Sequence, residues 1–510
     1  MNKVYDAIIV GGGHNGLVAA CYLAKAGKRV LVLEKRQEFG GATKGSYAFE
    51  GVAAKISRYS YLVALLPDQI IQDLDLEFQT LSRTVSSYTP SDSTGVLINR
   101  IFDEDSSKSI EQFAGDKSEA LAWREFYSRI AKVAELLAPT MLEPLKDEGE
   151  IKKLIGPSLW SEFMDRPISE SLNRNFKSDL IKGIVLTDGL IGTFASATEH
   201  LANICFLYHL IGNGTGEWKV PKGGMGALIS ALLQRARELG VELREGTEVT
   251  RVSNSESGVI VESDKGELFD SKLVIAGCAP TVLARISGLA APKSRDGSQV
   301  KINMVLKRLP KLKSGIDPEI AFAGTFHIDE SYSQLERAFQ QAKSGEIPDV
   351  IPAEMYCHTL TDPSILSKEM HAAGNHTLTL FALHTPAALF DKDHENAKAE
   401  VTKRILHGLN SYLAEPIEDL LLRDSSGRPC IEIKTPQELE AEIDLPRGNI
   451  FHADLSFPWK SEGEVGKWGV ETSNERILLA GAGSKRGGGV SGIGGHNAAM
   501  AALERLEVIN

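Results

Sequence analysis

The chain has 510 residues, of which 42% are hydrophobic and 24% are charged. This composition is typical of a globular protein and excludes disordered, collagen-like and coiled-coil chains, and the length predicts two to four domains or lobes. The formal net charge is −12. Such an acidic balance argues against nucleic acid as a partner and against binding to anionic lipid by charge.

The pattern of apolar residues and cysteines bears on the compartment. The apolar stretch at residues 4–10 ends in three glycines and is too short for a secretion signal. No run of about 18 apolar residues predicts a transmembrane segment. The five cysteines are scattered and form no C-x-x-C pair, which is typical of a reducing compartment. We expect a cytoplasmic protein and leave peripheral contact with a membrane open.

The first 34 residues predict a βαβ unit. Residues 4–10 read as a buried strand, residues 15–26 as a helix and residues 30–34 as a second strand. A Gly-Gly-Gly-His-Asn-Gly turn, which contains G-x-G-x-x-G, joins the first strand to the helix. This order of strand, glycine turn and helix is the pattern of a dinucleotide-binding fold.

Each glycine of the turn has an expected role. Gly11 permits the tight turn, Gly13 lets the backbone approach a pyrophosphate, and Gly16 lets the helix pack closely on the strand. The helix N-terminus then offers free N–H groups to the phosphates. Glu34 closes the second strand, where its carboxylate can accept hydrogen bonds from the adenosine ribose.

Two further segments carry nucleotide-binding signals. In the middle of the chain, a loop and an amphipathic helix at residues 222–240 precede short strands at 241–244, 248–253, 258–263 and 273–276. Near the C-terminus, a strand at 477–480 leads into a glycine-rich loop at 487–495 and a closing helix at 495–506. Side-chain-free backbone at a helix start can lie against the pyrimidine edge of a flavin, where the helix dipole stabilises negative charge.

These segments resemble a known family. The stretches GGGHNGLVAACYLAKAGKRVLVLEKRQEFGGA, PKGGMGALISALLQRARELGVELREGTEVTRV and LLAGAGSKRGGGVSGIGGHNAA are similar to the phytoene dehydrogenase-related FAD oxidoreductases, which include carotenoid desaturases, carotenoid ketolases and retinol saturase. Residues 188–196, 301–309 and 448–454 resemble, more narrowly, the branch of pyridine nucleotide-disulfide oxidoreductase domain-containing protein 2. The resemblance covers nearly the whole chain.

The resemblance implies FAD as the cofactor and an α/β fold: a Rossmann-like, doubly wound and discontinuous FAD-binding domain with an inserted α+β substrate domain. The expected parts are FAD-binding segments at 1–81, 217–299 and 441–510, a mostly helical inserted region at 82–216 and a substrate domain at 300–440. The residues that match the family's FAD motifs are Gly11, Gly13, Asn15, Gly16, Glu34, Lys35, Gly41, Ala42, Val249, Gly483, Val490, Gly492 and Ile493.

The sequence departs from wider FAD families in one place and does not support disulfide chemistry. Many of those families carry an acidic residue where this chain has Ala482. A redox-active dithiol is missing, and so is a second G-x-G-x-x-G motif for a nicotinamide cofactor. We therefore expect electrons to leave the flavin for oxygen, a quinone or another carrier.

Candidate substrate residues are fewer. We expect Arg58, Tyr61, Thr193, Phe194 and His384 to line the cavity beside the flavin, with core or surface packing as the alternative for each. The spacing of polar residues assigns no catalytic side chain and no metal ligands. None is required for hydride removal, because a flavin supplies the redox chemistry.

Three functions follow from these expectations. The first is an FAD-dependent dehydrogenase or desaturase that acts on an apolar small molecule of the isoprenoid or polyene kind. The second is an amine-oxidase-like flavoenzyme with a polar substrate, which aromatic pairs near the flavin would favour. The third is a non-catalytic protein that keeps FAD as a structural element. The sequence does not fix the oligomeric state.

Overall fold

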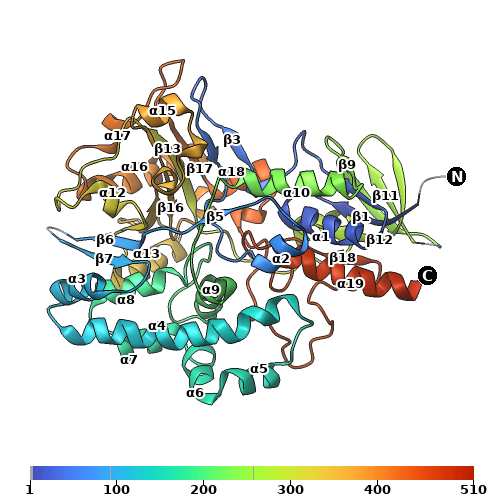
Figure 1. Ribbon diagram of the computed structural model, residues 1–510, viewed down its shortest axis with the longest axis horizontal. Coiled ribbons are helices and arrows are strands. Elements are labelled where there is room, and N and C mark those ends of the chain that lie inside the picture. The colour runs from blue at the N-terminus through green and yellow to red at the C-terminus, as the bar shows by residue number, and fades with distance from the viewer. Residues whose placement is uncertain (1–3, 92–93, 257, 510) are drawn as a thin grey trace.

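The structure is a computed structural model that describes residues 4–91, 94–256 and 258–509. Figure 1 shows one β-sheet near the two chain termini, a second sheet at the opposite side of the molecule, and a group of helices below the second sheet. The architecture is α/β, as the sequence predicts.

The sheet near the termini is built from three separate parts of the chain. Its strands are β1 (Val4–Val10), β2 (Val30–Leu33), β9 (Glu242–Arg244), β10 (Val249–Asn254), β11 (Val259–Ser263), β12 (Leu268–Ala276) and β18 (Ile477–Leu479). The order is β10-β11-β12-β1-β2-β9, and β18 pairs in parallel with the end of β12. β12 begins five residues before the predicted strand, because its first residues pair with β11 in antiparallel fashion.

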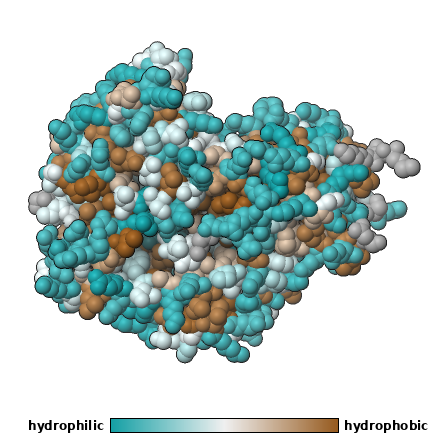
Figure 2. All heavy atoms as spheres, viewed as in Figure 1, coloured by the Kyte–Doolittle hydropathy of each residue, from teal (hydrophilic) through white to brown (hydrophobic). Residues whose placement is uncertain are grey.

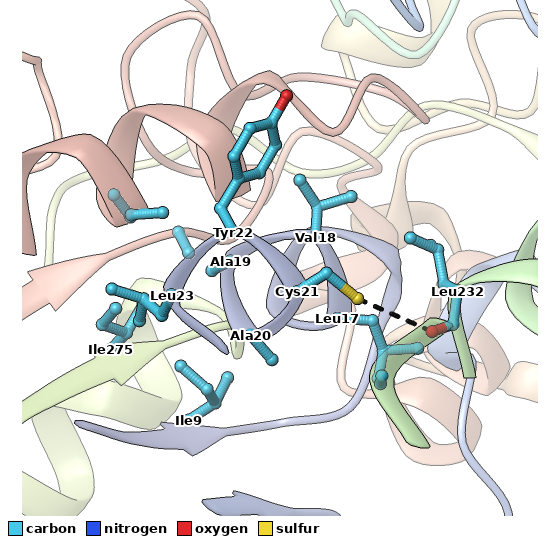
Figure 3. Packing of buried hydrophobic residues seen from close by; sticks show 14 of the residues in the cluster. Ile9, Leu17, Val18, Ala19, Ala20, Cys21, Tyr22, Leu23, Leu232 and Ile275 are labelled. Carbon is cyan, nitrogen blue, oxygen red and sulfur yellow. Dashed lines mark hydrogen bonds between the residues drawn. The ribbon is translucent and has the colours of Figure 1, made fainter. Parts of the chain in front are cut away.

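Helices cover both faces of this sheet. Helices α1 (His14–Lys25), α10 (Gly226–Glu238) and α19 (Ile493–Ile509) lie on one face, and α11 (Pro280–Ser287) lies on the other. Because side chains alternate along a strand, Ile9 of β1 packs under α1 while Ile8 packs toward α11. Figure 3 shows apolar side chains of α1 that face the sheet, and it also shows the thiol of Cys21, which donates a hydrogen bond to the carbonyl of Leu232 in α10 at 3.6 Å.

The second sheet also collects distant segments. Its strands are β6 (Val85–Pro90), β7 (Gly95–Asn99), β13 (Val300–Leu306), β14 (Thr325–Ile328), β15 (Ala353–Tyr356), β16 (His376–Ala382) and β17 (Ile431–Lys434). The order is β17-β13-β16-β15-β14-β6-β7. Strands β6 and β7 come from the region that the sequence predicts to be mostly helical, and the chain returns from them to the helices below.

Most of the region between 104 and 214 is helical. It contains α3 (Glu104–Ala114), α4 (Lys117–Leu137), η2 (Ala138–Leu142), α5 (Glu148–Ile155), α6 (Pro157–Trp160), η3 (Ser161–Asp165), α7 (Ile168–Asn175), α8 (Asp179–Thr187), α9 (His200–Ile211) and η4 (Gly212–Gly214). These helices pack around a core of their own that includes Trp123, Phe126 and Phe206. No helix among the residues described is long and apolar enough to cross a membrane.

Short elements connect these layers. They are η1 (Gly41–Thr43), β3 (Gly45–Tyr47), β4 (Lys55–Ser57), α2 (Asp68–Asp73), β5 (Thr80–Leu81), β8 (Val220–Pro221), α12 (Pro318–Ala321), α13 (Tyr332–Lys343), α14 (His358–Thr361), η5 (Pro363–Ile365), α15 (Lys368–Ala372), η6 (Ala387–Phe390), α16 (His394–Tyr412), α17 (Ile417–Leu420), α18 (Pro436–Ile443) and η7 (Pro446–Gly448).

A buried arginine joins the C-terminal glycine loop to the helical region. Arg486 is 1% exposed. Its guanidinium donates hydrogen bonds to the carbonyls of Thr140 and Glu143, both at 2.7 Å, and of Trp468 at 2.9 Å. Burial lowers the pKa of Arg486 to about 10, so the group stays charged at neutral pH.

We predict that Arg486→Met destabilises the fold by about 3 kcal/mol, because the buried carbonyls of Thr140 and Trp468 and the part-buried carbonyl of Glu143 lose a charged donor. The matched control is Lys467→Met, which removes an exposed ion pair with Glu504 and should cost less than about 0.5 kcal/mol. Urea denaturation of both variants measures the difference. Equal stability of the two variants would show that the arginine does not hold this junction.

Candidate functional site

A cleft runs between the two sheets and is lined by all three nucleotide-binding segments. It encloses about 1770 Å³ of empty space, counted out to its mouth. From the first segment it is lined by Gly11, Gly13, His14, Asn15, Glu34, Lys35, Arg36, Gly41 and Ala42; from the second by Thr247, Glu248, Val249, Gly277 and Cys278; and from the third by Ala482, Gly489 and Val490. The second sheet supplies the wall that carries Gln299, Glu354, Tyr356 and Phe381.

The glycine turn after β1 has the geometry that a bound phosphate requires. Gly11 has a φ of +98°, which glycine adopts without strain. A Cβ on Gly16 would lie 2.3 Å from the carbonyl oxygen of Gly11, so only glycine lets α1 start this close to the strand. A Cβ on Gly13 would meet no atom within 4 Å and would project into open space at the helix N-terminus.

Glu34 is buried at the floor of the cleft and is already oriented. Its two carboxylate oxygens accept hydrogen bonds from the backbone N–H groups of Gly12 and Arg36, each at 2.9 Å. Lys35 and Arg36 both pair with Asp444, at 2.6 and 3.0 Å. These two ion pairs tie the loop after β2 to the segment that follows α18, and they hold one rim of the cleft.

The C-terminal glycine loop contributes less directly than expected. Val490 lines the cleft, but Gly483, Gly492 and Ile493 are not among its lining residues. A Cβ on Gly483 would meet the Pro280 ring at 2.5 Å. Gly492 has a φ of +70°, and a Cβ there would face Ile70, Leu66 and Val18 rather than the cleft. Backbone conformation and core packing therefore account for glycine at 492.

The residues present fit a large polar cofactor such as FAD. Two observations support this fit. The space in front of Gly13 is open. In addition, the cleft is lined by two residues whose buried polar atoms, Asn15 Oδ1 and His452 Nδ1, have no hydrogen-bond partner among the described residues. Burial lowers the pKa of His452 to about 4, and that of His14 to about 4, so both rings are neutral near pH 7. A neutral ring can donate and accept one hydrogen bond each.

Of the predicted substrate residues, only Tyr61 lines the cleft. Arg58 instead turns to Glu432 of β17, with its Nε 2.9 Å from the carboxylate. Thr193, Phe194 and His384 are not in the cleft lining either. The Phe194 ring instead packs 4.9 Å from the Phe339 ring and 6.0 Å from the His384 ring. Arg58 contacts Glu432 and Phe194 contacts Phe339, and both partners are distant in sequence, so no local pattern predicts these contacts.

Sequence reasoning missed several cleft residues that the structure brings together. The rings of Tyr61 and Tyr356 lie 4.8 Å apart, and the indole of Trp218 stacks on His209 with centroids 5.0 Å apart. The hydroxyl of Tyr356 donates to Glu354. The one available signal for Glu354 is a charged residue within the otherwise apolar strand Ala-Glu-Met-Tyr, an unusual residue for an interior strand.

One face of the second sheet is polar although it is buried. Across β13, β16, β15 and β14, the directly paired residues Lys301, Phe381, Glu354 and His327 form a row. Lys301 donates to the carbonyls of Ser57 and Ser60, and burial lowers its pKa well below the ordinary value. The opposite face carries apolar residues such as Ile302 and Met355.

Burial also shifts the acids of this wall. It raises the pKa of Glu354 to about 8, helped by repulsion from Glu330. It raises the pKa of Asp188, at the end of α8, to about 6. Carboxyl groups with such values exchange protons near neutral pH, which suits acid–base work beside a redox cofactor.

Comparison with known proteins defines the class. Residues 9–64 match the NAD(P)-binding Rossmann-like domain, and residues 69–424 match the flavin containing amine oxidoreductase family. The protein is an FAD-dependent oxidoreductase. The chain belongs to the flavin containing amine oxidoreductase family. When bound, FAD accepts the electrons that the reaction removes.

Relatives extend over the whole chain. An uncharacterized protein of Mycobacterium tuberculosis is 43% identical over 526 aligned positions, which cover 99% of this chain and 98% of the relative. Pyridine nucleotide-disulfide oxidoreductase domain-containing protein 2 of Mus musculus is 30% identical, covering 99% and 94%. A prolycopene isomerase of Daucus carota is 23% identical over 84% of this chain and 70% of the relative.

Solved structures share the fold. A triple mutant of putrescine oxidase aligns with a TM-score of 0.59 at 17% identity, covering 99% of each chain. Cyclohexylamine oxidase from Brevibacterium oxydans aligns with a TM-score of 0.54 at 14% identity, also covering 99% of each chain.

We predict that Glu34→Ala weakens FAD binding by about 1–3 kcal/mol, roughly 5- to 150-fold, because a buried charged acceptor is lost. Titration of the apoprotein with FAD, followed by flavin fluorescence, measures the affinity. Glu34→Gln should have an intermediate effect, since its amide retains one oxygen acceptor. Unchanged affinity in Glu34→Ala would mean that the carboxylate only braces the loop through Gly12 and Arg36.

Substitutions at Gly13 and Gly492 should distinguish an effect on cofactor binding from an effect on folding. Gly13→Val places a side chain in open space at ordinary φ, so we expect the thermal midpoint of the apoprotein to change little while FAD affinity falls at least tenfold. Gly492→Val imposes strain at φ +70° and crowds the core, so we expect both quantities to fall. Full FAD affinity in Gly13→Val would place the pyrophosphate elsewhere.

Proposed function

We propose that the protein is an FAD-dependent dehydrogenase of the desaturase type whose substrate is an apolar small molecule of the isoprenoid or polyene kind. The observation that carries this proposal is the apolar part of the cleft lining, which includes Leu62, Ala64, Leu65, Ile450 and Phe451. Burial of a hydrocarbon against such a wall gains about 25 cal/mol per Å². The similarity to prolycopene isomerases supports the same substrate class.

In this proposal the nucleotide half of the cleft holds FAD. Gly11, Gly13, Asn15 and Gly16 take the pyrophosphate at the start of α1, and Glu34 takes the ribose. The remaining expected contacts are Lys35, Gly41, Ala42, Val249, Gly483, Val490, Gly492 and Ile493, the last three of them acting through the loop that opens α19. Tyr61 and Tyr356 then face the substrate.

A second candidate is oxidation of an amine. It is favoured by the Tyr61–Tyr356 pair and by Glu354 at the same end of the cleft. Aromatic faces and a carboxylate both attract an ammonium group. The similar solved structures include amine oxidases, but at 17% and 14% sequence identity they support the fold and not the substrate.

We further propose that oxygen or a quinone accepts the electrons, and that the protein works in the cytoplasm. All five cysteines are free thiols, as a reducing compartment favours. An apolar substrate partitions into membranes, so we propose brief peripheral contact for its uptake. On the face drawn in Figure 2, hydrophobic residues lie in separate groups among hydrophilic ones, which suits transient rather than permanent contact.

The test is anaerobic mixing of the FAD-loaded protein with two panels of compounds. Retinol and detergent-dispersed phytoene, which do not absorb in the visible flavin band, represent the polyenes, and putrescine and cyclohexylamine represent the amines. We expect a polyene to bleach the visible flavin absorbance. Leu65→Gln should slow that bleaching about tenfold, because a buried apolar contact is lost. The control Leu121→Gln changes an exposed residue of α4 and should leave the rate unchanged.

Bleaching by an amine alone, followed by release of hydrogen peroxide on exposure to air, would overturn the polyene proposal in favour of amine oxidation. Restored flavin absorbance on addition of oxygen or of a soluble quinone then identifies the acceptor.

A further inference from the structure

A cluster of potential metal ligands lies behind the substrate end of the cleft. It consists of His327 on β14, Glu330 just after that strand, and Glu354 on β15. His327 and Glu354 are direct partners in the sheet, and one nitrogen or oxygen atom from each of the three residues lies within 4.8 Å of the others. The backbone of two paired strands therefore fixes the spacing of the donor atoms.

Each carboxylate of the cluster has one oxygen held and one oxygen free. Glu330 Oε2 accepts a hydrogen bond from Thr187 at 2.9 Å and contacts His327 Nδ1, and Glu354 Oε2 accepts one from Tyr356. Glu330 Oε1 and Glu354 Oε1 are buried without a partner among the described residues, and the two side chains are only 1% and 2% exposed. Held carboxylates with free oxygens are the arrangement that outer hydrogen bonds produce around a metal.

The charges around the cluster are unbalanced. Asp188 adds a third carboxylate close by. Its charge attracts a protonated His327 and repels an ionised Glu330. Arg83, 8% exposed, is a cation that interacts electrostatically with Glu354 and with Asp188. If all three acids were ionised, three carboxylates and one guanidinium would leave two negative charges in a buried place, which is costly unless they are compensated. Either protons or a bound divalent cation can compensate them, and the geometry of the donor atoms favours the cation.

The cluster is also reachable. His327 and Glu354 line a second cavity, together with Arg83 and Asp188, and this cavity shares Glu354, Tyr356, Ile191 and Trp218 with the main cleft. Two of the three candidate ligands, His327 and Glu354, therefore face a cavity, and such an open side is typical of a metal site that keeps a position for water or substrate.

We propose that His327, Glu330 and Glu354 bind one divalent transition-metal ion at the wall between the two cavities. One imidazole and two carboxylates suit zinc or manganese better than magnesium or calcium, which prefer oxygen alone. The ion lies where a polar group at the end of a substrate can complete its coordination. This site is independent of the substrate class proposed above.

The test uses the FAD-loaded, tag-free protein after treatment with a chelator and dialysis. Titration with Mn²⁺, followed by electron paramagnetic resonance, and with Zn²⁺, followed by calorimetry, should each show one site per chain with micromolar or tighter affinity. Competition of Zn²⁺ with Mn²⁺ should show that both ions occupy the same site.

Three variants locate the site. Glu354→Gln and Glu330→Gln should each weaken Mn²⁺ binding at least tenfold, and the control Glu346→Gln, on an exposed turn after α13, should bind as the wild type does. The flavin spectrum and thermal midpoint of each variant report whether it is folded.

Failure of the wild-type protein to bind either ion would overturn the proposal, whatever the variants do, and would mean that protons neutralise the cluster. Equal affinity in the wild type and in a folded Glu354→Gln or Glu330→Gln variant would also overturn it, since the ion would then bind elsewhere. Neither result bears on which organic compound reduces the flavin.

Discussion

The site depends on one constraint: parallel strands end at the same edge of a sheet. β1 lies between β2 and β12, and β18 continues the parallel set beside β12. The loops that leave these four strands therefore converge on one line. They converge so closely that a Cβ on Gly481 would lie 2.8 Å from the carbonyl oxygen of Cys278. Glycine at the ends of these strands is therefore needed to bring the loops together around the cleft, as well as to make room for the cofactor.

The two faces of the second sheet differ: one is apolar and packs against a helix, and the other carries buried polar residues. Its apolar face packs against α16 through residues such as Val401 and Ile405. Its other face presents Lys301, Glu354 and His327, each buried and each carrying a polar group that needs compensation. Such a row would be destabilising in an ordinary core. Because Glu354 lines the cleft and His327 lines the adjoining cavity, we infer that these buried polar groups serve the site rather than the stability of the sheet.

Local sequence predicted the nucleotide half of the molecule well and the substrate half poorly. The βαβ unit at the N-terminus and the helix at α10 follow from hydrophobic periodicity and glycine punctuation, which are local signals. Arg58 and Phe194 were expected at the cleft, but their positions depend on Glu432 and Phe339, which local patterns cannot pair with them. β6 and β7 are not predicted as strands although they pair with each other as a local hairpin, and only the pairing of β6 with β14 joins residues more than 200 positions apart.

The division of the nucleotide-binding sheet among three segments bears on how the chain reaches its native state. β1 leaves the ribosome first and β18 among the last, and β12 must pair with both. Contacts between such distant segments pay a large loop-closure entropy before they gain any packing energy, so they form late. Until the final helix α19 covers α1, the apolar residues beneath it stay exposed. The newly made chain therefore passes through a stage in which its earliest segment is vulnerable to aggregation, and capture of the nucleotide falls at the end of folding rather than at its start.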